Sequence, residues 1–263
     1  MVWPAMKDGT IAHCEILTPE IFWDEFYLQS DSLHPKQKEF IDNLIAAKSK
    51  HGIVNEDLVE RVYQDVYTKP KAGDGMILYK KLENHIKGLY NGKEPITMAM
   101  KMAAEKRKEL LHRNKDAVAL LERAKLREEE IYWEMEGVKC KGKPDANNVD
   151  SETKTILIVD LKIGKDPIAE EELAEKIKFY GYPRQLRYYE RGIRASEELQ
   201  MIYDDLHEYK AERYIIHIDP VVARVFQVTD ELALEQDAEI NRGLALIKKI
   251  ETEGPTKQEI ISL

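Results

Sequence analysis

Apolar residues in the first half of the chain recur every three or four positions, which is the period of an α-helix. Local signals mark some of the helix starts, because Thr18 precedes Pro19 and Asn55 precedes an apolar repeat. The stretch 69–75, "KPKAGDG", contains one proline and two glycines and breaks the pattern. These features predict helices over residues 18–29, 34–52 (ending at Gly52), 55–67, 76–92 and 95–125.

At Glu130 the period changes to two, which is typical of β-strands. The stretch 130–140 alternates glutamate and tyrosine with apolar residues and predicts one half-buried strand. A second strand follows over 142–149, the polar "DSET" at 150–153 forms a turn, and 154–162 is nearly all apolar, as expected of a central strand. The remaining elements are a helix over 170–194 that is disturbed at Gly181 and Pro183, a short helix over 196–206, strands over 212–219 and 222–229, and a closing helix over 230–251.

All predicted strands lie in the second half of the chain, which indicates an α/β core preceded by a helical part. With 263 residues, 43% of them hydrophobic, the chain is long enough to bury a full core. No run of about 18 apolar residues and no signal-peptide pattern occurs, so we expect a soluble, cytoplasmic protein without a membrane partner. Only Cys14 and Cys140 are present, which excludes a disulfide framework and an iron–sulfur cluster, and any metal should be held by oxygen.

The net charge of −9 argues against nucleic-acid binding by the whole surface, because neutralising phosphates requires lysine and arginine. Basic residues nevertheless concentrate between Lys139 and Arg194. A solvated helix and loop surface would explain this concentration as well as a binding face would.

The strongest candidate for chemistry is the pair of strands at 142–162. Residues two apart in a strand share a face, so Asp160 and Lys162 project together, and cross-strand pairing would bring Asp145 near Asp160. Two close carboxylates repel each other unless a divalent cation lies between them, and oxygen ligands suit Mg²⁺ or Mn²⁺. A solvated hairpin would show the same alternation, so Asp160 and Lys162 alone do not establish a site.

The combined pattern Pro144-Asp145 followed by Asp160-Leu161-Lys162 resembles the PD-(D/E)XK nuclease superfamily. In "YGYPRQLRYYE", Gln185 and Tyr188 are similar to the Q-x-x-Y motif of the exonuclease branch related to RecB and lambda-type exonucleases. The stretch "LREEEIYWEMEGVKCKGKPDAN" resembles phage and bacterial exonuclease VIII-like domains.

This resemblance implies a restriction-endonuclease-like core over residues 71–263, with a central mixed sheet flanked by helices, and a helical extension over residues 1–70. It implies one or two Mg²⁺ or Mn²⁺ ions, with Lys162 positioning the attacking water and Gln185 and Tyr188 supporting the site. Implied metal ligands are Asp145, Asp160, the backbone carbonyl of Leu161, Glu130 (with Glu134 as second choice) and His85. The candidate DNA contacts are Lys143, Lys165, Arg184 and Arg187.

The function implied by the resemblance is a metal-dependent DNA exonuclease of the recombination or repair type, encoded by a phage or prophage. Its expected partners are linear duplex DNA with free ends, a single-strand annealing protein, and further copies of the chain in a ring. The alternatives are a structure-specific or restriction-type endonuclease with the same core, a catalytically inactive DNA-binding protein on this fold, and a structural α/β protein that carries the motif by accident.

Overall fold

The computed structural model describes residues 4–29, 33–51 and 54–253, and the chain divides into two compact units. The first unit combines Met1–Leu17 with Lys106–Leu263, and the second is Thr18–Glu105. The boundary expected after residue 70 therefore falls inside the second unit. The physical reason is that the helices on both sides of residue 70 share one apolar core, which contains Phe40, Val62 and Leu82.

The second unit is mainly helical. The side chain of Asn55 caps one of its helices by accepting a hydrogen bond from Leu58 N, as predicted. Its elements are η1 (Pro19–Ile21), α2 (Phe22–Glu25), β1 (Phe26–Leu28), α3 (Pro35–His51), α4 (Glu56–Val66), α5 (Asp74–Tyr90) and β2 (Glu94–Ile96). Gly52, the predicted end of α3, lies outside the described residues.

Two expectations for this unit are wrong. Residues 18–29 do not form one helix, because Thr18 makes no side-chain cap and the chain becomes extended at Phe26. Strands are also present in the first half of the chain, since β1 pairs in parallel with β2. Both strands have only three residues, which is too short for a period of two to stand out in the sequence.

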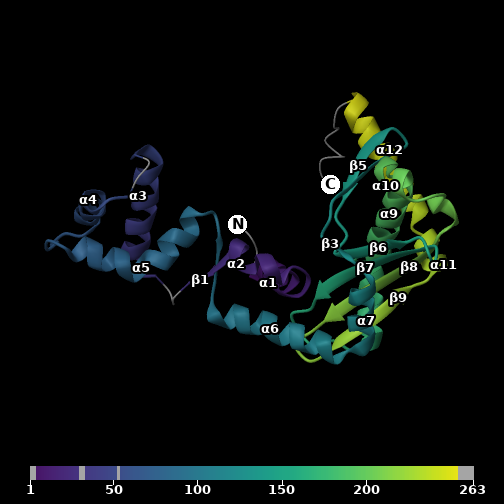
Figure 1. The fold of residues 1–263 in the computed structure, drawn as a ribbon, viewed down its shortest axis with the longest axis horizontal. Coiled ribbons are helices and arrows are strands. Elements are labelled where there is room, and N and C mark those ends of the chain that lie inside the picture. Colours follow the sequence, from purple (N-terminus) through teal and green to yellow (C-terminus); the bar gives the residue numbers. More distant parts are fainter. Residues whose placement is uncertain (1–3, 30–32, 52–53, 254–263) are drawn as a thin grey trace. The chain divides into compact units, whose positions relative to one another are not determined.

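The first unit is built on a five-stranded mixed sheet (Figure 1). Strand β7 (Thr155–Ile163) is its centre and is buried over most of its length, as its apolar sequence predicts. It pairs in parallel with β8 and antiparallel with β6, and β3 and β9 form the two edges in antiparallel pairs. The other strands are β3 (Leu126–Arg127), β6 (Ala146–Asp150), β8 (Lys210–Ile218) and β9 (Ala223–Val228).

Helices cover both faces of this sheet, because β7 alternates its apolar side chains between the faces. Leu157, Val159 and Leu161 pack with α1 (Pro4–Leu17), α6 (Met98–Arg113) and α7 (Lys115–Arg123). Ile156 and Ile158 pack with α8 (Glu170–Phe179), α9 (Tyr182–Ala195), α10 (Glu197–Ile202) and α11 (Asp230–Leu234). The predicted α/β fold with a central mixed sheet flanked by helices is therefore confirmed. No helix in the described ranges has the length and apolar character needed to cross a membrane.

The stretch 130–140, predicted as one strand, is part of a hairpin. Strands β4 (Ile131–Met135) and β5 (Val138–Gly142) are joined by Glu136 and Gly137, which both have positive φ. Two such residues are typical of the tight turn of a β-hairpin. The buried positions are odd-numbered before the turn, at Trp133 and Met135, and even-numbered after it, at Val138 and Cys140. This change in the alternation is the sequence feature that indicates two strands.

Two predicted helices are each divided in the structure. Asn114 ends α6 and caps α7 by accepting hydrogen bonds from the backbone N–H groups of Asp116 and Ala117. The predicted closing helix is divided into α11 and α12 (Asp237–Glu253). A short 3₁₀ helix, η2 (Leu206–Glu208), precedes β8. By contrast, the predicted disturbance at Gly181 is confirmed, because it separates α8 from α9.

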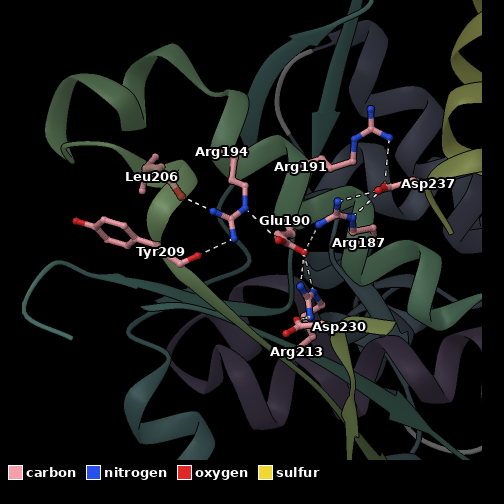
Figure 2. A network of polar contacts seen from close by, with 9 residues as sticks. All are labelled: Arg187, Glu190, Arg191, Arg194, Leu206, Tyr209, Arg213, Asp230 and Asp237. Atoms are coloured by element: carbon pink, nitrogen blue, oxygen red, sulfur yellow. Dashed lines mark hydrogen bonds and ion pairs between the residues drawn. The ribbon is translucent and has the colours of Figure 1, made fainter. Parts of the chain in front are cut away.

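A network of charged side chains fixes α9 to its neighbours (Figure 2). Glu190 is only 2% exposed and forms ion pairs with Arg213 on β8 at 2.7 Å, Arg187 at 2.9 Å and Arg194 at 3.0 Å. Burial raises the pKa of Glu190, but the arginines outweigh burial and hold that pKa below its usual value. The network continues to α11 and α12, because Arg213 binds Asp230 and Arg187 binds Asp237.

We expect Glu190→Gln to lower the free energy of unfolding by about 3–5 kcal/mol, because it removes the buried counter-charge that three arginines share and leaves the buried Arg213 paired with the exposed Asp230. Urea unfolding followed by circular dichroism measures this loss. Glu208→Gln is the matched control, because Glu208 forms an exposed pair with Lys154 and should cost much less. Equal losses in the two variants would contradict a stabilising role for the network.

Candidate active site

The β6–β7 hairpin brings two aspartates together. Ala146 pairs with Val159, so Asp145, which directly precedes β6, lies beside Asp160 on β7. Asp145 Oδ2 accepts a hydrogen bond of 2.6 Å from Leu161 N, which fixes the carboxylate against the strand. The proximity that the hairpin spacing predicts is present.

Both carboxyl groups are in an environment that disfavours their charge. Burial raises the pKa of Asp145, and the Leu161 N–H and Lys162 offset this only partly. Burial also raises the pKa of Asp160, and the neighbouring Asp145 charge raises it further. Asp160 is 1% exposed, and its buried Oδ2 accepts no hydrogen bond from the described residues, although Lys162 Nζ lies 2.8 Å away. A bound cation would relieve the repulsion between the two carboxylates.

Lys162 projects on the same face of β7 as Asp160, as predicted. Its Nζ donates hydrogen bonds of 3.1 Å to Asp160 Oδ1 and to Gln185 Oε1, and it lies 4.7 Å from the ring centroid of Tyr182. Burial lowers the pKa of Lys162, but the Asp160 charge more than compensates, and the pKa is raised overall. Lys162 therefore carries a fixed positive charge at neutral pH.

Three side chains could hold a metal ion beside this pair. One ligand atom from each of His13, Glu128 and Asp145 lies within 4.8 Å of the others, and His13 Nδ1 is 3.8 Å from Asp145 Oδ2. Burial lowers the pKa of His13, which leaves its imidazole neutral and able to donate a lone pair. Carboxylate and imidazole donors fit a divalent cation such as Mn²⁺ or Mg²⁺. The donor set thus combines carboxylate oxygens with one histidine nitrogen, as the resemblance implies, but the histidine is His13 and not His85.

The carboxylate that lies beside Asp145 and comes before it in the chain is Glu128. Glu130, the predicted ligand, is exposed and interacts with the Tyr132 hydroxyl and with Lys141 Nζ at 3.7 Å, while Glu134 is exposed opposite Lys139 on the β4–β5 hairpin. Strand β3 ends at Arg127, and Glu128 has a φ of 49° while its N–H donates to the Asp145 carbonyl. The sequence predicts no strand before residue 130, so Glu128, which directly follows β3, was not among the candidate ligands.

The predicted histidine, His85, belongs to the second unit. It is buried there, with its Nδ1 3.1 Å from the Tyr27 hydroxyl and the two rings packed edge to face. His13, on α1, is the histidine of the metal-ligating group. Sequence reasoning missed it because α1 is far from the hairpin in the chain and carries no motif.

The tyrosine that contacts Gln185 is Tyr189. Gln185 Nε2 donates a hydrogen bond of 2.9 Å to the Tyr189 hydroxyl, one helical turn further along α9. The predicted residue, Tyr188, instead packs against Trp133 of the hairpin, with ring centroids 4.9 Å apart. Burial raises the pKa of both tyrosines, so both hydroxyls stay protonated.

The four candidate DNA contacts have different environments. Lys143 forms an ion pair of 2.7 Å with Glu128, and Arg184 pairs with Glu239. Arg187 is mostly buried and serves the network around Glu190, so the structure uses its charge internally. Lys165 is exposed in the loop after β7.

Comparisons with known proteins add a distant similarity. No protein-family model matches the sequence, and no curated protein matches it. Among solved structures, the chain is similar to one described as a putative exonuclease from Eubacterium rectale, with 14% sequence identity, 88% of each chain covered and a TM-score of 0.47. The site described above rests on the geometry of this chain alone.

The buried carboxylates predict a specific effect on stability without metal. Because the folded state raises their pKa values, the metal-free protein should lose stability as the pH rises from about 4 to neutral. Asp145→Asn removes the repulsion and keeps an acceptor for Leu161 N. We expect it to raise the melting temperature in EDTA at neutral pH by about 2–4 °C and to abolish stabilisation by Mn²⁺.

Differential scanning fluorimetry measures both effects. Asp219→Asn is the control, because Asp219 is also buried, but its ion pair with Arg224 and its backbone hydrogen bonds outweigh burial and lower its pKa. Asp219→Asn should therefore melt at a lower temperature than the wild-type protein. If Asp145→Asn lowered the melting temperature of the metal-free protein as Asp219→Asn does, the result would contradict the expected repulsion between Asp145 and Asp160.

Proposed function

We propose that the protein is a divalent-metal-dependent nuclease that hydrolyses phosphodiester bonds of DNA. The observation that carries the proposal is the convergence of Asp145, Asp160 and Lys162 from one hairpin, with a potential metal-ligating group at Asp145. Buried carboxylates with raised pKa values beside a permanently charged lysine are typical of a functional site. An ordinary solvated hairpin would expose these side chains to water.

In this proposal the cation is held by His13, Glu128, Asp145 and Asp160, with the Leu161 carbonyl as a further ligand from the resemblance. A bound divalent cation supplies Lewis-acid stabilisation of the charge that develops on the phosphate. The protein contributes a fixed arrangement of donors, because Asp145 is anchored by Leu161 N and Glu128 is held by Lys143. Glu130 and His85, the ligands suggested by sequence, are not needed in it.

Lys162 has a separate role. Its raised pKa makes it a poor base at neutral pH, so it acts as a hydrogen-bond donor and a positive charge. Asp160 and Gln185 hold its ammonium group, and Tyr189 holds Gln185 in turn. Such a preorganised charge can orient the attacking water and stabilise the phosphate in the transition state.

More specifically, we propose an exonuclease that acts at the ends of linear DNA in recombination or repair, with one or two Mg²⁺ or Mn²⁺ ions. The Gln185–Lys162 hydrogen bond supports this choice, because it ties the helix that carries the exonuclease-like motif to the catalytic strand. A phage or prophage origin, a single-strand annealing partner and a homo-oligomeric ring remain part of the proposal through the resemblance.

Lys162→Gln should slow Mg²⁺-dependent digestion of an end-labelled linear duplex at least about 100-fold, because it removes the positive charge from the site. DNA binding in Ca²⁺ should persist. The melting temperature should fall, because Asp160 loses the ammonium group beside it, so digestion is compared well below the melting temperature of the variant. Lys154→Gln is the control, because Lys154 lies in the β6–β7 turn and pairs with Glu208. Unchanged digestion by the Lys162 variant would remove Lys162 from the mechanism.

Linear and covalently closed circular forms of one plasmid separate the remaining alternatives. We expect the wild-type protein with Mg²⁺ to digest the linear form and leave the closed circle intact, because an exonuclease requires an end. Asp160→Asn run beside it should be inactive on both. Cleavage of the closed circle would support the endonuclease, and DNA binding without cleavage of either form would support an inactive binding protein.

A further inference from the structure

A groove of about 290 Å³ begins at Lys162 and continues between the loop after β7 and the turn that joins α8 to α9. Its walls combine basic and aromatic side chains with one histidine at its base. The lining residues that matter here are Lys162, Lys165, Lys176, Tyr180, Tyr182 and His217. Its size is close to the lower limit for small-molecule sites, so it can receive one compact group next to the catalytic lysine.

One wall of the groove is a stack of two tyrosine rings. Tyr180 and Tyr182 have ring centroids 5.8 Å apart and an interplanar angle of 24°. Gly181 between them has a φ of +70°, a conformation that disfavours other residues. Tyr182 contacts Lys162, while Tyr180 is 57% exposed and is followed outward by Phe179, which is 83% exposed. An aromatic path therefore leads from the catalytic lysine to the surface.

His217 is a buried polar residue in the lining of the groove. It lies on β8 opposite Lys162, is only 8% exposed, and its Nδ1 has no hydrogen-bond partner among the described residues. Buried polar nitrogens are rarely left unpaired. Gly164 makes room for the ring, because a Cβ at that position would lie 2.8 Å from His217 Cε1. The groove thus contains a buried polar group whose partner is missing within the described chain.

The rim of the groove carries positive charge. Lys165 is exposed and forms no ion pair with any residue in the described ranges, and Lys176 is held in an exposed pair with Glu172 at 2.9 Å. Asp166 is the acidic residue in the lining. Lysines beside exposed aromatic rings are the combination that binds single-stranded nucleic acid, with phosphates near the lysines and bases stacked on the rings.

We propose that this groove binds one unpaired nucleotide next to the bond that is cleaved, with its base stacked on the exposed ring of Tyr180, which itself stacks on Tyr182, and its phosphate near Lys165. The inference rests on the proposed nuclease function and adds the substrate class, a single-stranded or locally opened DNA end. Both faces of a base inside a duplex are covered by neighbouring bases, so an aromatic ring such as Tyr180 can stack on a base only at a DNA end or in an unpaired segment.

Binding of fluorescein-labelled oligothymidylate, measured by anisotropy with Ca²⁺ in place of Mg²⁺, tests the proposal. Tyr180→Ala should weaken binding about tenfold, which corresponds to about 1.4 kcal/mol, whereas Tyr180→Phe should bind like the wild type because it keeps the ring. Tyr132→Ala is the matched control, because Tyr132 is 59% exposed on the β4–β5 hairpin. Unchanged affinity of Tyr180→Ala for the oligonucleotide would overturn the proposal.

Two further probes identify what Tyr180 contacts. On an abasic oligonucleotide of the same length, Tyr180→Ala should have no effect, because there is no base to stack, while Lys165→Ala should still weaken binding. On a relaxed, covalently closed circular duplex, which has no end to open, Tyr180→Ala should again have no effect. A tenfold loss on the abasic strand or on the closed circle would overturn stacking on an unpaired base.

The outcome is separable from that of the nuclease proposal. Tyr180-dependent binding without Mg²⁺-dependent cleavage would refute the nuclease and keep the nucleotide subsite. Cleavage together with Tyr180-independent binding would keep the nuclease and refute the subsite.

Discussion

The structure of the site depends on two carboxylates that are held beside each other in the interior of the first unit. Burying Asp145 and Asp160 at the end of a hairpin costs free energy that packing alone does not recover. Neighbouring groups offset this cost. The Leu161 N–H donates to Asp145, the ammonium group of Lys162 pairs with Asp160, and His13 and Glu128 lie close enough to Asp145 to bind a cation together with it. A protein without use for such charge would place apolar residues there.

Helix α9 connects this site to the stability of the unit. Its first turn carries Gln185, which binds Lys162. A later turn carries Glu190, which forms ion pairs with two arginines of the same helix and with Arg213 of β8. The β4–β5 hairpin also packs against this helix. Gly192 leaves space for the Trp133 ring, because a Cβ on residue 192 would lie 2.8 Å from that ring. The position of Lys162 is therefore supported by contacts that extend far beyond its own strand.

The site and the adjacent groove divide the work between two kinds of side chain. In the proposed function, the carboxylates, His13 and Lys162 would provide charge at the position of the phosphate, and the ring of Tyr180, supported by Tyr182, would provide an apolar surface of the kind a nucleobase prefers. Lys162 belongs to both, since its ammonium group contacts Asp160 and the Tyr182 ring. This shared contact would couple the position of the bound nucleotide to that of the catalytic charge.

The amino-acid sequence alone determined what depends on short separations along the chain. The period of two and the four-residue turn place Asp145, Asp160 and Lys162 on one hairpin, and Gly181 with Pro183 marks the start of the helix that carries Gln185. The tertiary structure decided the contacts between distant segments: His13 from α1 enters the site, Gln185 from α9 reaches Lys162, and Arg187 binds Asp237 of α12. Hydrogen bonding within a strand pair or a helix follows from local geometry, whereas contacts between elements depend on how their apolar faces pack, which no local pattern records.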